Sequence, residues 1–213
     1  MELPKVLAPH VREGISRWTG PALADLGSAD AKAYAAFAEV LDALGEASGE
    51  VQHLKGPLTT VTKLREARGV GEDRRCYVLR EGNRVLGLVH VGPKHLYYWQ
   101  RGGGTVQMDP LCVLDFYVGA QRSGFGLKLF DAMLAAEGLE ARSLAYDRPS
   151  PKMLPFLRKH YGLSNYNEQP NNFVVFDDYF AGGVVPLRRT EIRPHSTSDK
   201  IHADAGQTYD PDF

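Results

Sequence analysis

The sequence contains only two cysteines, Cys76 and Cys112, among its 213 residues. This scarcity argues against a disulfide framework, excludes a zinc site built from cysteines alone, and fits a reducing cytosol. The seven histidines show no paired spacing typical of metal ligands, so we expect no metal.

The chain also lacks a strong net charge and long apolar runs. Its formal net charge is −1, so it has no general attraction to nucleic acid or to anionic membranes. No apolar run approaches the ~20 residues of a membrane helix, and the opening MELPKVLAPHVREG has no apolar signal-peptide core. With 43% hydrophobic and 24% charged residues, we expect one globular domain that is monomeric and has no nucleic-acid or membrane partner.

The most informative stretch is Asp109–Leu129. It opens with an apolar run typical of a buried strand, Leu111–Tyr117, and breaks at Gly119. The loop QRSGFG at 121–126 follows, and apolar residues then recur at helical spacing. A glycine-containing loop between a strand and a helix points backbone N–H groups at an anion. Arg122 would add a positive charge, so the pattern predicts a pyrophosphate cradle.

Two common phosphate loops do not fit this stretch. A P-loop needs Lys-Ser or Lys-Thr after its second glycine, where this chain has Phe125 after Gly124. A dinucleotide-binding turn needs a third glycine after Gly126, and none is present. The remaining pattern, Gln/Arg-x-x-Gly-x-Gly/Ala, resembles the coenzyme A loop of GCN5-related acetyltransferases. Taken alone, it is equally compatible with an ordinary strand-to-helix connection.

Hydrophobic periodicity predicts the other elements. We expect a strand near Lys5–Val11, and a helix over 31–44 that is capped by Ser28 or Asp30 and ended by Gly45. Two hairpins are predicted, one that pairs 76–80 with 84–91 and one that pairs 95–100 with 105–117. They are followed by a short strand at 143–146, a helix at 151–160 and a late strand at 173–176.

This order of elements predicts an α/β (α+β) fold with a mixed, mostly antiparallel central sheet flanked by helices. The domain would cover residues 1–180. Residues 181–213 are rich in Gly, Pro, Arg, Asp and Ser/Thr without apolar periodicity, so we expect a disordered C-terminal tail.

Several segments in one order resemble the α-tubulin N-acetyltransferase family, a branch of the GCN5-related acetyltransferases. The resemblance covers roughly 38–180 and is carried by LDALGEASGEVQHLKGPLT at 41–59, PLCVLDFY at 110–117, QRSGFG at 121–126, DRPSPKMLPFLRKHYGL at 147–163 and NNFVVFDDYF at 171–180. The chain departs from the family pattern in a shorter link between Tyr117 and Gln121, and in a glycine-rich turn at 99–104.

The resemblance implies a transferase that uses acetyl-CoA as its co-substrate. The acetyl group would pass to a lysine of α-tubulin in microtubules, by direct attack of the lysine amine in a ternary complex. The location would be the cytoplasm and cytoskeleton, including the axoneme of a cilium or flagellum. The alternatives are an acetyltransferase of another protein or of a small amine, and a catalytically silent microtubule-binding module.

The resemblance also implies a set of site residues. Asp147, at the end of a strand, matches the family aspartate that positions or deprotonates the lysine; otherwise it would pair with Arg148 or cap the next helix. Cys112 is a second proton acceptor or a small buried hydrophobe, and Gln52 matches a glutamine near the active site or is an ordinary loop residue. The cofactor would contact Phe116, Tyr117, Val118, Gln121, Arg122, Ser123, Gly124, Phe125, Gly126, Leu127, Ser150, Lys152, Phe156 and Lys159, although Lys159 would equally suit a solvated helix face.

Overall fold

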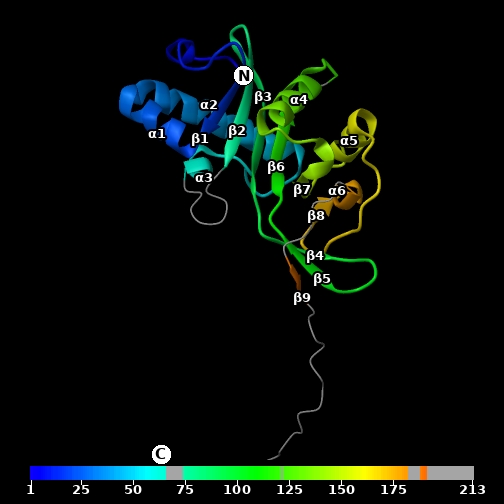
Figure 1. The fold of residues 1–213 in the computed structure, drawn as a ribbon. Helices are drawn as coiled ribbons and strands as arrows, with labels where there is room; N and C mark the ends of the chain where they lie inside the picture. The colour runs from blue at the N-terminus through cyan, green and yellow to red at the C-terminus, as the bar shows by residue number, and fades with distance from the viewer. Residues whose placement is uncertain (66–73, 121, 182–187, 191–213) are drawn as a thin grey trace, which may run out of the picture.

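The computed structural model of the chain describes residues 1–65, 74–120, 122–181 and 188–190. Its centre is a six-stranded sheet of order β1-β2-β3-β6-β7-β8 (Figure 1). Only the β6–β7 pair of this sheet is parallel, so the predicted mixed, mostly antiparallel architecture is confirmed. The strands are β1 (Gly14–Thr19), β2 (Arg75–Glu81), β3 (Arg84–Pro93), β6 (Leu111–Val118), β7 (Ala145–Asp147) and β8 (Phe173–Val175).

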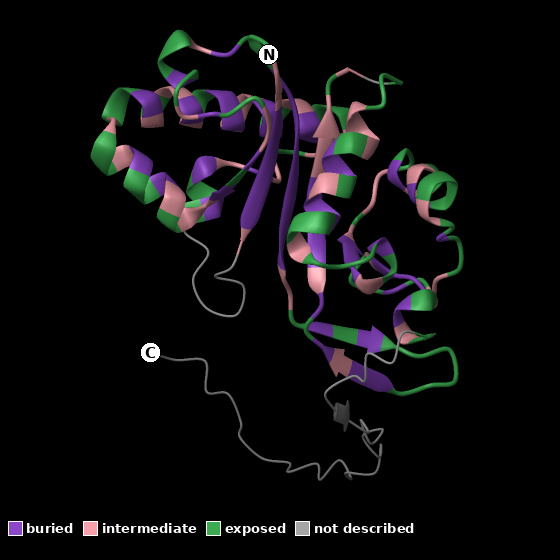
Figure 2. Ribbon diagram, turned by 45° about the horizontal axis from the view of Figure 1, so that its top comes forward, coloured by how far each residue is buried: buried purple, intermediate pink, exposed green. Residues whose placement is uncertain are grey.

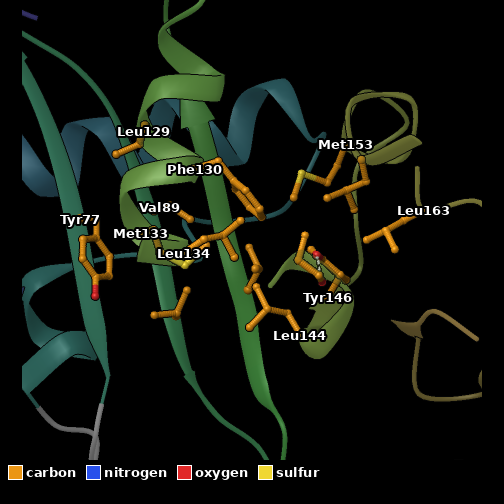
Figure 3. Close-up of a cluster of buried hydrophobic side chains, with 14 of the residues drawn as sticks. Tyr77, Val89, Leu129, Phe130, Met133, Leu134, Leu144, Tyr146, Met153 and Leu163 are labelled. Atoms are coloured by element: carbon orange, nitrogen blue, oxygen red, sulfur yellow. Dashed lines mark hydrogen bonds between the residues drawn. The ribbon is translucent and has the colours of Figure 1, made fainter. Parts of the chain in front are cut away.

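Helices cover both faces of this sheet, and two apolar cores lie between the layers (Figures 1 and 2). The helices α1 (Gly20–Ala29), α2 (Ala31–Val51) and α3 (Val61–Arg65) lie on one side, with the short η1 (Lys5–Leu7). On the other side are α4 (Phe125–Glu137), η2 (Ala141–Ser143) and α5 (Met153–Tyr161). The apolar side chains of α4 face strands β2 and β3, where Phe130 and Met133 are fully buried near Val89 (Figure 3).

A second sheet combines the hairpin β4 (Leu96–Trp99) and β5 (Thr105–Met108) with β9 (Arg188–Thr190). The predicted return strand over 105–117 is therefore wrong in its length. It breaks at Asp109-Pro110, where proline removes a ladder donor, and β6 joins the other sheet. A third apolar cluster packs this hairpin onto β6, β7, β8 and α6 (Asp178–Ala181).

The predicted tail is only partly described. Residues 188–190 form the short strand β9, which pairs with β5. Residues 182–187 and 191–213 lie outside the described part of the chain. The domain limit at 180 therefore stays a prediction.

The N-terminal third differs most from the prediction. The strand expected near Lys5–Val11 is a short 3-10 helix, and the first strand is Gly14–Thr19. Asp30 caps α2 as predicted, with its Oδ1 accepting from the N–H of Ala33 at 2.9 Å. Gly45, however, does not end the helix, because α2 continues to Val51.

Gly45 has a packing role instead. A Cβ atom at this position would lie 1.9 Å from the backbone oxygen of Thr59. The glycine therefore lets the segment 57–59 lie directly on α2. This contact places Thr59 beside the middle of β6, where the functional site begins.

Candidate active site

A cleft opens where β6 and β7 separate. The two strands pair at only two positions, the last of which joins Val113 to Tyr146. β6 then continues to Val118, whereas β7 ends at Asp147. Backbone groups of β6 beyond Val113 have no ladder partner in β7. Leu114–Phe116 line the cleft at this point, so backbone donors and acceptors border it.

A β-bulge accompanies this separation. β3 pairs His90 with Asp115 and then Val91 with Val113, so Leu114 is an extra residue in β6. A bulge bends its strand and increases the local twist. The bend helps to carry β6 away from β7.

The start of α4 contains the glycine turn that the sequence predicts to bind an anion. Gly124 caps the helix in the left-handed conformation, with φ +79°, and the first helical bond runs from Lys128 N–H to Gly124 O at 3.0 Å. The N–H groups of residues 125–127 therefore precede the hydrogen-bonded part of the helix, at its positive end. A Cβ at Gly126 would meet only Phe116, at 3.5 Å, so a ligand can approach the backbone closely.

The cleft beside this turn has a volume of about 330 Å³. Its walls combine apolar and cationic side chains, which are Phe116, Val118, Met153, Phe156, Arg122 and Lys152. Apolar walls suit the thiol-bearing arm of coenzyme A, and cations near a helix N-terminus suit its phosphates. The residues present therefore fit this cofactor.

Most of the predicted cofactor residues line this cleft: Phe116, Tyr117, Val118, Arg122, Gly126, Ser150, Lys152 and Phe156. Ser123, Gly124, Phe125 and Leu127 belong to the turn and the start of α4 but are not lining residues, and Lys159 is exposed on α5. Gln121 lies outside the described residues. Contact between these residues and the cofactor stays a prediction.

Asp147 ends β7 and borders the adjoining pocket, which shares Gln52 and Phe116 with the cofactor cleft. Its two carboxylate oxygens accept hydrogen bonds from Nε and Nη2 of Arg148, at 3.0 and 3.3 Å. The expected pairing with Arg148 is therefore present. At the start of α5, the N–H of Met153 donates to the hydroxyl of Ser150 and not to Asp147. The Arg148 side chain is half exposed, so an incoming ammonium group can compete for the carboxylate.

Cys112 lies inside β6 and is completely buried. Its thiol donates to the carbonyl oxygen of Pro110 at 3.5 Å. Burial, together with the nearby charge of Asp147, raises the pKa of the Cys112 thiol. The role of Cys112, as a second proton acceptor or as a small buried hydrophobe, stays a prediction.

Gln52 lies at the end of α2 and borders both the cofactor cleft and the space beside Asp147. Its amide Nε2 donates to the hydroxyl of Ser48 at 2.9 Å and to Oδ1 of Asp115 at 3.3 Å. Ser48 in turn donates to Oδ1 of Asp115 at 2.6 Å. The predicted glutamine is therefore part of a polar cluster and not an isolated loop residue.

Asp115 is the centre of this cluster. It is 4% exposed, and it has no ion-pair partner among the residues that the structure describes. Thr59 donates to its Oδ2 at 2.7 Å, and the same hydroxyl lies 3.1 Å from Nδ1 of His90. Burial raises the pKa of Asp115, although the hydrogen bonds from Ser48, Thr59 and Gln52 favour its charged form.

Apart from Gln52, the residues of this cluster were not predicted as site residues. Ser48, Thr59 and Asp115 come from three separate segments, and only tertiary packing joins them. Two signals were present in the sequence: an aspartate inside the apolar run LCVLDFYV, and the glycines Gly45 and Gly49 within a helical pattern. Each is typical of a special packing or functional position.

The described residues hold no cluster of His, Cys, Asp and Glu that could bind a metal ion. Among the helices in the described ranges, none is both long and apolar enough to span a bilayer.

Comparison with known proteins agrees with this geometry. Residues 5–205 match the model of the family described as GNAT acetyltransferase, Mec-17. The α-tubulin N-acetyltransferase of Tetrahymena thermophila is 46% identical over 67% of this chain and 35% of its own length. The enzyme of that name from Leishmania infantum is 41% identical over 87% of this chain and 79% of its own length. α-Tubulin N-acetyltransferase 1 of Danio rerio is 40% identical over 76% and 58%.

This chain thus spans about a third to four fifths of the length of these relatives. A solved toxin structure with bound acetyl-CoA shares 18% identity over 47% of this chain, with a TM-score of 0.30, which is too low to support an inference. The family match covers most of the chain, including every element that lines the cleft. The chain therefore belongs to the Mec-17 family of GNAT acetyltransferases.

Proposed function

We propose that this protein transfers the acetyl group of acetyl-CoA to a lysine side chain of α-tubulin in microtubules. The observation that carries the proposal is that two pockets adjoin beside β6 and share Gln52, Phe116, Ser150 and Met153 in their walls. One of them is lined by Gly126 at the start of α4, and the other by Asp147 at the end of β7. The family membership and the names of the relatives support acetyl transfer and α-tubulin as the substrate.

Each part of the cleft has a role in this proposal. Acetyl-CoA supplies an activated thioester. The α4 N-terminus, Arg122 and Lys152 bind its phosphates, and Phe116 and Phe156 enclose its arm. Backbone N–H groups on the unpaired edge of β6 are suited to stabilise the oxyanion that develops on the acetyl carbonyl.

The lysine side of the cleft handles the proton. A lysine ammonium has an ordinary pKa near ~10.4, so it must lose a proton before it can attack. The carboxylate of Asp147 attracts the ammonium and accepts that proton, directly or through a water molecule. The amine then attacks the thioester in a ternary complex, without an acyl-enzyme.

A substrate panel tests the proposal. The protein would be incubated with radiolabelled acetyl-CoA and, in parallel, with polymerised tubulin, free tubulin, an unrelated lysine-rich protein or a small amine. We expect label chiefly on polymerised tubulin, and initial-rate lines that intersect when both substrates are varied. Greater label on the other acceptors would refute the substrate, and parallel lines would refute direct transfer.

The proposed place of action of this protein is on cytoplasmic microtubules, including those of an axoneme.

A further inference from the structure

The buried carboxylate of Asp115 has no obvious structural benefit. It lies in the middle of the sheet, and its partners among the described residues are all neutral: the side chains of Ser48, Thr59 and Gln52 and the backbone N–H of Phe116. An uncompensated buried charge costs stability, and an apolar residue in the same strand would avoid that cost. Groups held at such a cost beside a cleft are often functional.

The cluster determines how the Gln52 amide is oriented. Its Nε2 donates toward two acceptors, the Ser48 hydroxyl at 2.9 Å and Oδ1 of Asp115 at 3.3 Å, which lie 2.6 Å from each other. The nitrogen end of the amide therefore faces the buried cluster. No described residue donates to its carbonyl oxygen, Oε1, so this atom is available to the cleft that Gln52 lines.

The other side of the cluster holds the Asp115 carboxylate in place. Thr59 donates its only hydroxyl hydrogen to Oδ2, so it must accept from Nδ1–H of His90. Burial lowers the pKa of His90 to about 3, which keeps the ring neutral and able to donate from this one nitrogen. Both oxygens of Asp115 are therefore held, one from β3 and the segment 57–59, the other from α2.

We propose that Asp115 is a positioning residue for acetyl transfer: directly and through Ser48 it anchors the amide nitrogen of Gln52, so that the amide oxygen is presented to the amine of the acceptor lysine. When the amine donates one N–H to this oxygen, the lone pair on its nitrogen is directed away from the oxygen. Gln52 lies between the cofactor cleft and Asp147, so its oxygen can orient the amine between them. This inference rests on the proposed function.

The test is a double-mutant cycle of Asp115→Asn and Gln52→Ala. An asparagine at 115 replaces one acceptor oxygen with a donor, and this breaks the pattern that fixes the amide. We expect Asp115→Asn to lower kcat/KM for tubulin by about 10- to 100-fold, the range for a misplaced positioning group. In the Gln52→Ala background it should cost less than about twofold, because the two residues act as one unit. The affinity for acetyl-CoA should stay unchanged in each variant.

Glu137→Gln is the matched control. Glu137 is a half-buried, hydrogen-bonded carboxylate, held by Arg75 and Tyr77 at the far end of α4. Its loss should lower the melting temperature and leave kcat/KM unchanged. A loss of activity equal to that of Asp115→Asn would mean that both act through general destabilisation. If Asp115→Asn does not fold, Ser48→Ala removes one acceptor of the amide and should show the same dependence on Gln52.

A second readout does not depend on activity. In the wild type, the two side-chain N–H signals of Gln52 in an NMR spectrum, assigned by their loss in Gln52→Ala, should exchange slowly with solvent. In Asp115→Asn they should exchange rapidly. Fully additive kinetic losses, or unchanged exchange, would overturn the inference. A wild type without activity on tubulin would refute the proposed function alone, because the exchange measurement still reports on Asp115.

Discussion

Gly45→Ala is a demanding test of how the site is built, because two physical effects oppose each other. Alanine is favoured over glycine within a helix by about 1 kcal/mol, so helix propensity alone predicts a more stable protein. In this structure, however, the new Cβ would lie 1.9 Å from the carbonyl oxygen of Thr59. To reach ordinary contact, that distance must grow to at least 3.4 Å, and the atom that must move belongs to the backbone.

Forcing extra atoms into a packed site typically costs about 1–3 kcal/mol. Backbone atoms yield less easily than flexible side chains, so we expect the upper half of that range before the gain in helix propensity. The net loss should be about 1–2 kcal/mol, which lowers the melting temperature by roughly 2–8 °C for a chain of this length. The displacement of Thr59 should also disturb Asp115 and reduce turnover.

Urea denaturation measures the free energy of unfolding, and Gly27→Ala provides the control. Gly27 lies in α1, and its Cβ would lie 3.5 Å from the ring of Tyr34, an ordinary contact. That variant should be more stable than the wild type by about 0.5–1 kcal/mol. If Gly45→Ala were equally stabilising, the close approach of the segment 57–59 to α2 would be wrong.

Three further predictions concern the cofactor, the lysine and the buried charge. Gly126→Asp should greatly weaken acetyl-CoA binding in calorimetry, because it places a carboxylate at the anion site. Gly126→Ala, whose Cβ has room at 3.5 Å from Phe116, should bind nearly as well as wild type. Equal affinities of the two variants would exclude this turn as the phosphate site. Asp147→Asn should keep acetyl-CoA affinity and lose about 10²–10⁴-fold in turnover, and a rate within about twofold of wild type would remove it from proton transfer. Burial raises the pKa of Asp115 in the folded protein above the value of ~3.9 in the unfolded chain. Asp115 therefore stabilises the fold at a pH below the unfolded pKa, and this stabilisation is lost as the pH rises through the folded pKa. The stability of wild type relative to Asp115→Asn should therefore fall in urea denaturation as pH rises above that unfolded value, and a constant difference would contradict the burial of the charge.

The cofactor turn could be predicted because its signals are local. The apolar run of β6, the glycines at 124 and 126 and the helical spacing after them lie within one short segment. Propensity and backbone conformation within that segment largely determine the strand, the turn and the helix. The position of Asp147 was also predictable, because β7 is a short apolar run that ends at this residue.

The Asp115 cluster could not be predicted in the same way, since it depends on contacts between distant segments. Ser48 and Asp115 are separated by 67 residues, and Thr59 reaches the cluster only because Gly45 allows close packing. The extra residue at Leu114 likewise appears only when β6 is paired with β3. The expected end of α2 at Gly45 was wrong for this reason: glycine commonly ends helices, but here tertiary packing requires it inside one.

The central claim is that the cleft between β6 and β7 transfers an acetyl group to a lysine of α-tubulin. Its most direct test is mass spectrometry of polymerised tubulin after incubation with isotopically labelled acetyl-CoA and the full chain, beside a parallel incubation with Gly126→Asp. The account predicts labelled acetyl on the side-chain nitrogen of a lysine in α-tubulin, formed with wild type and nearly absent with the variant. The absence of labelled lysine with wild type, or equal labelling by the two proteins, would contradict it.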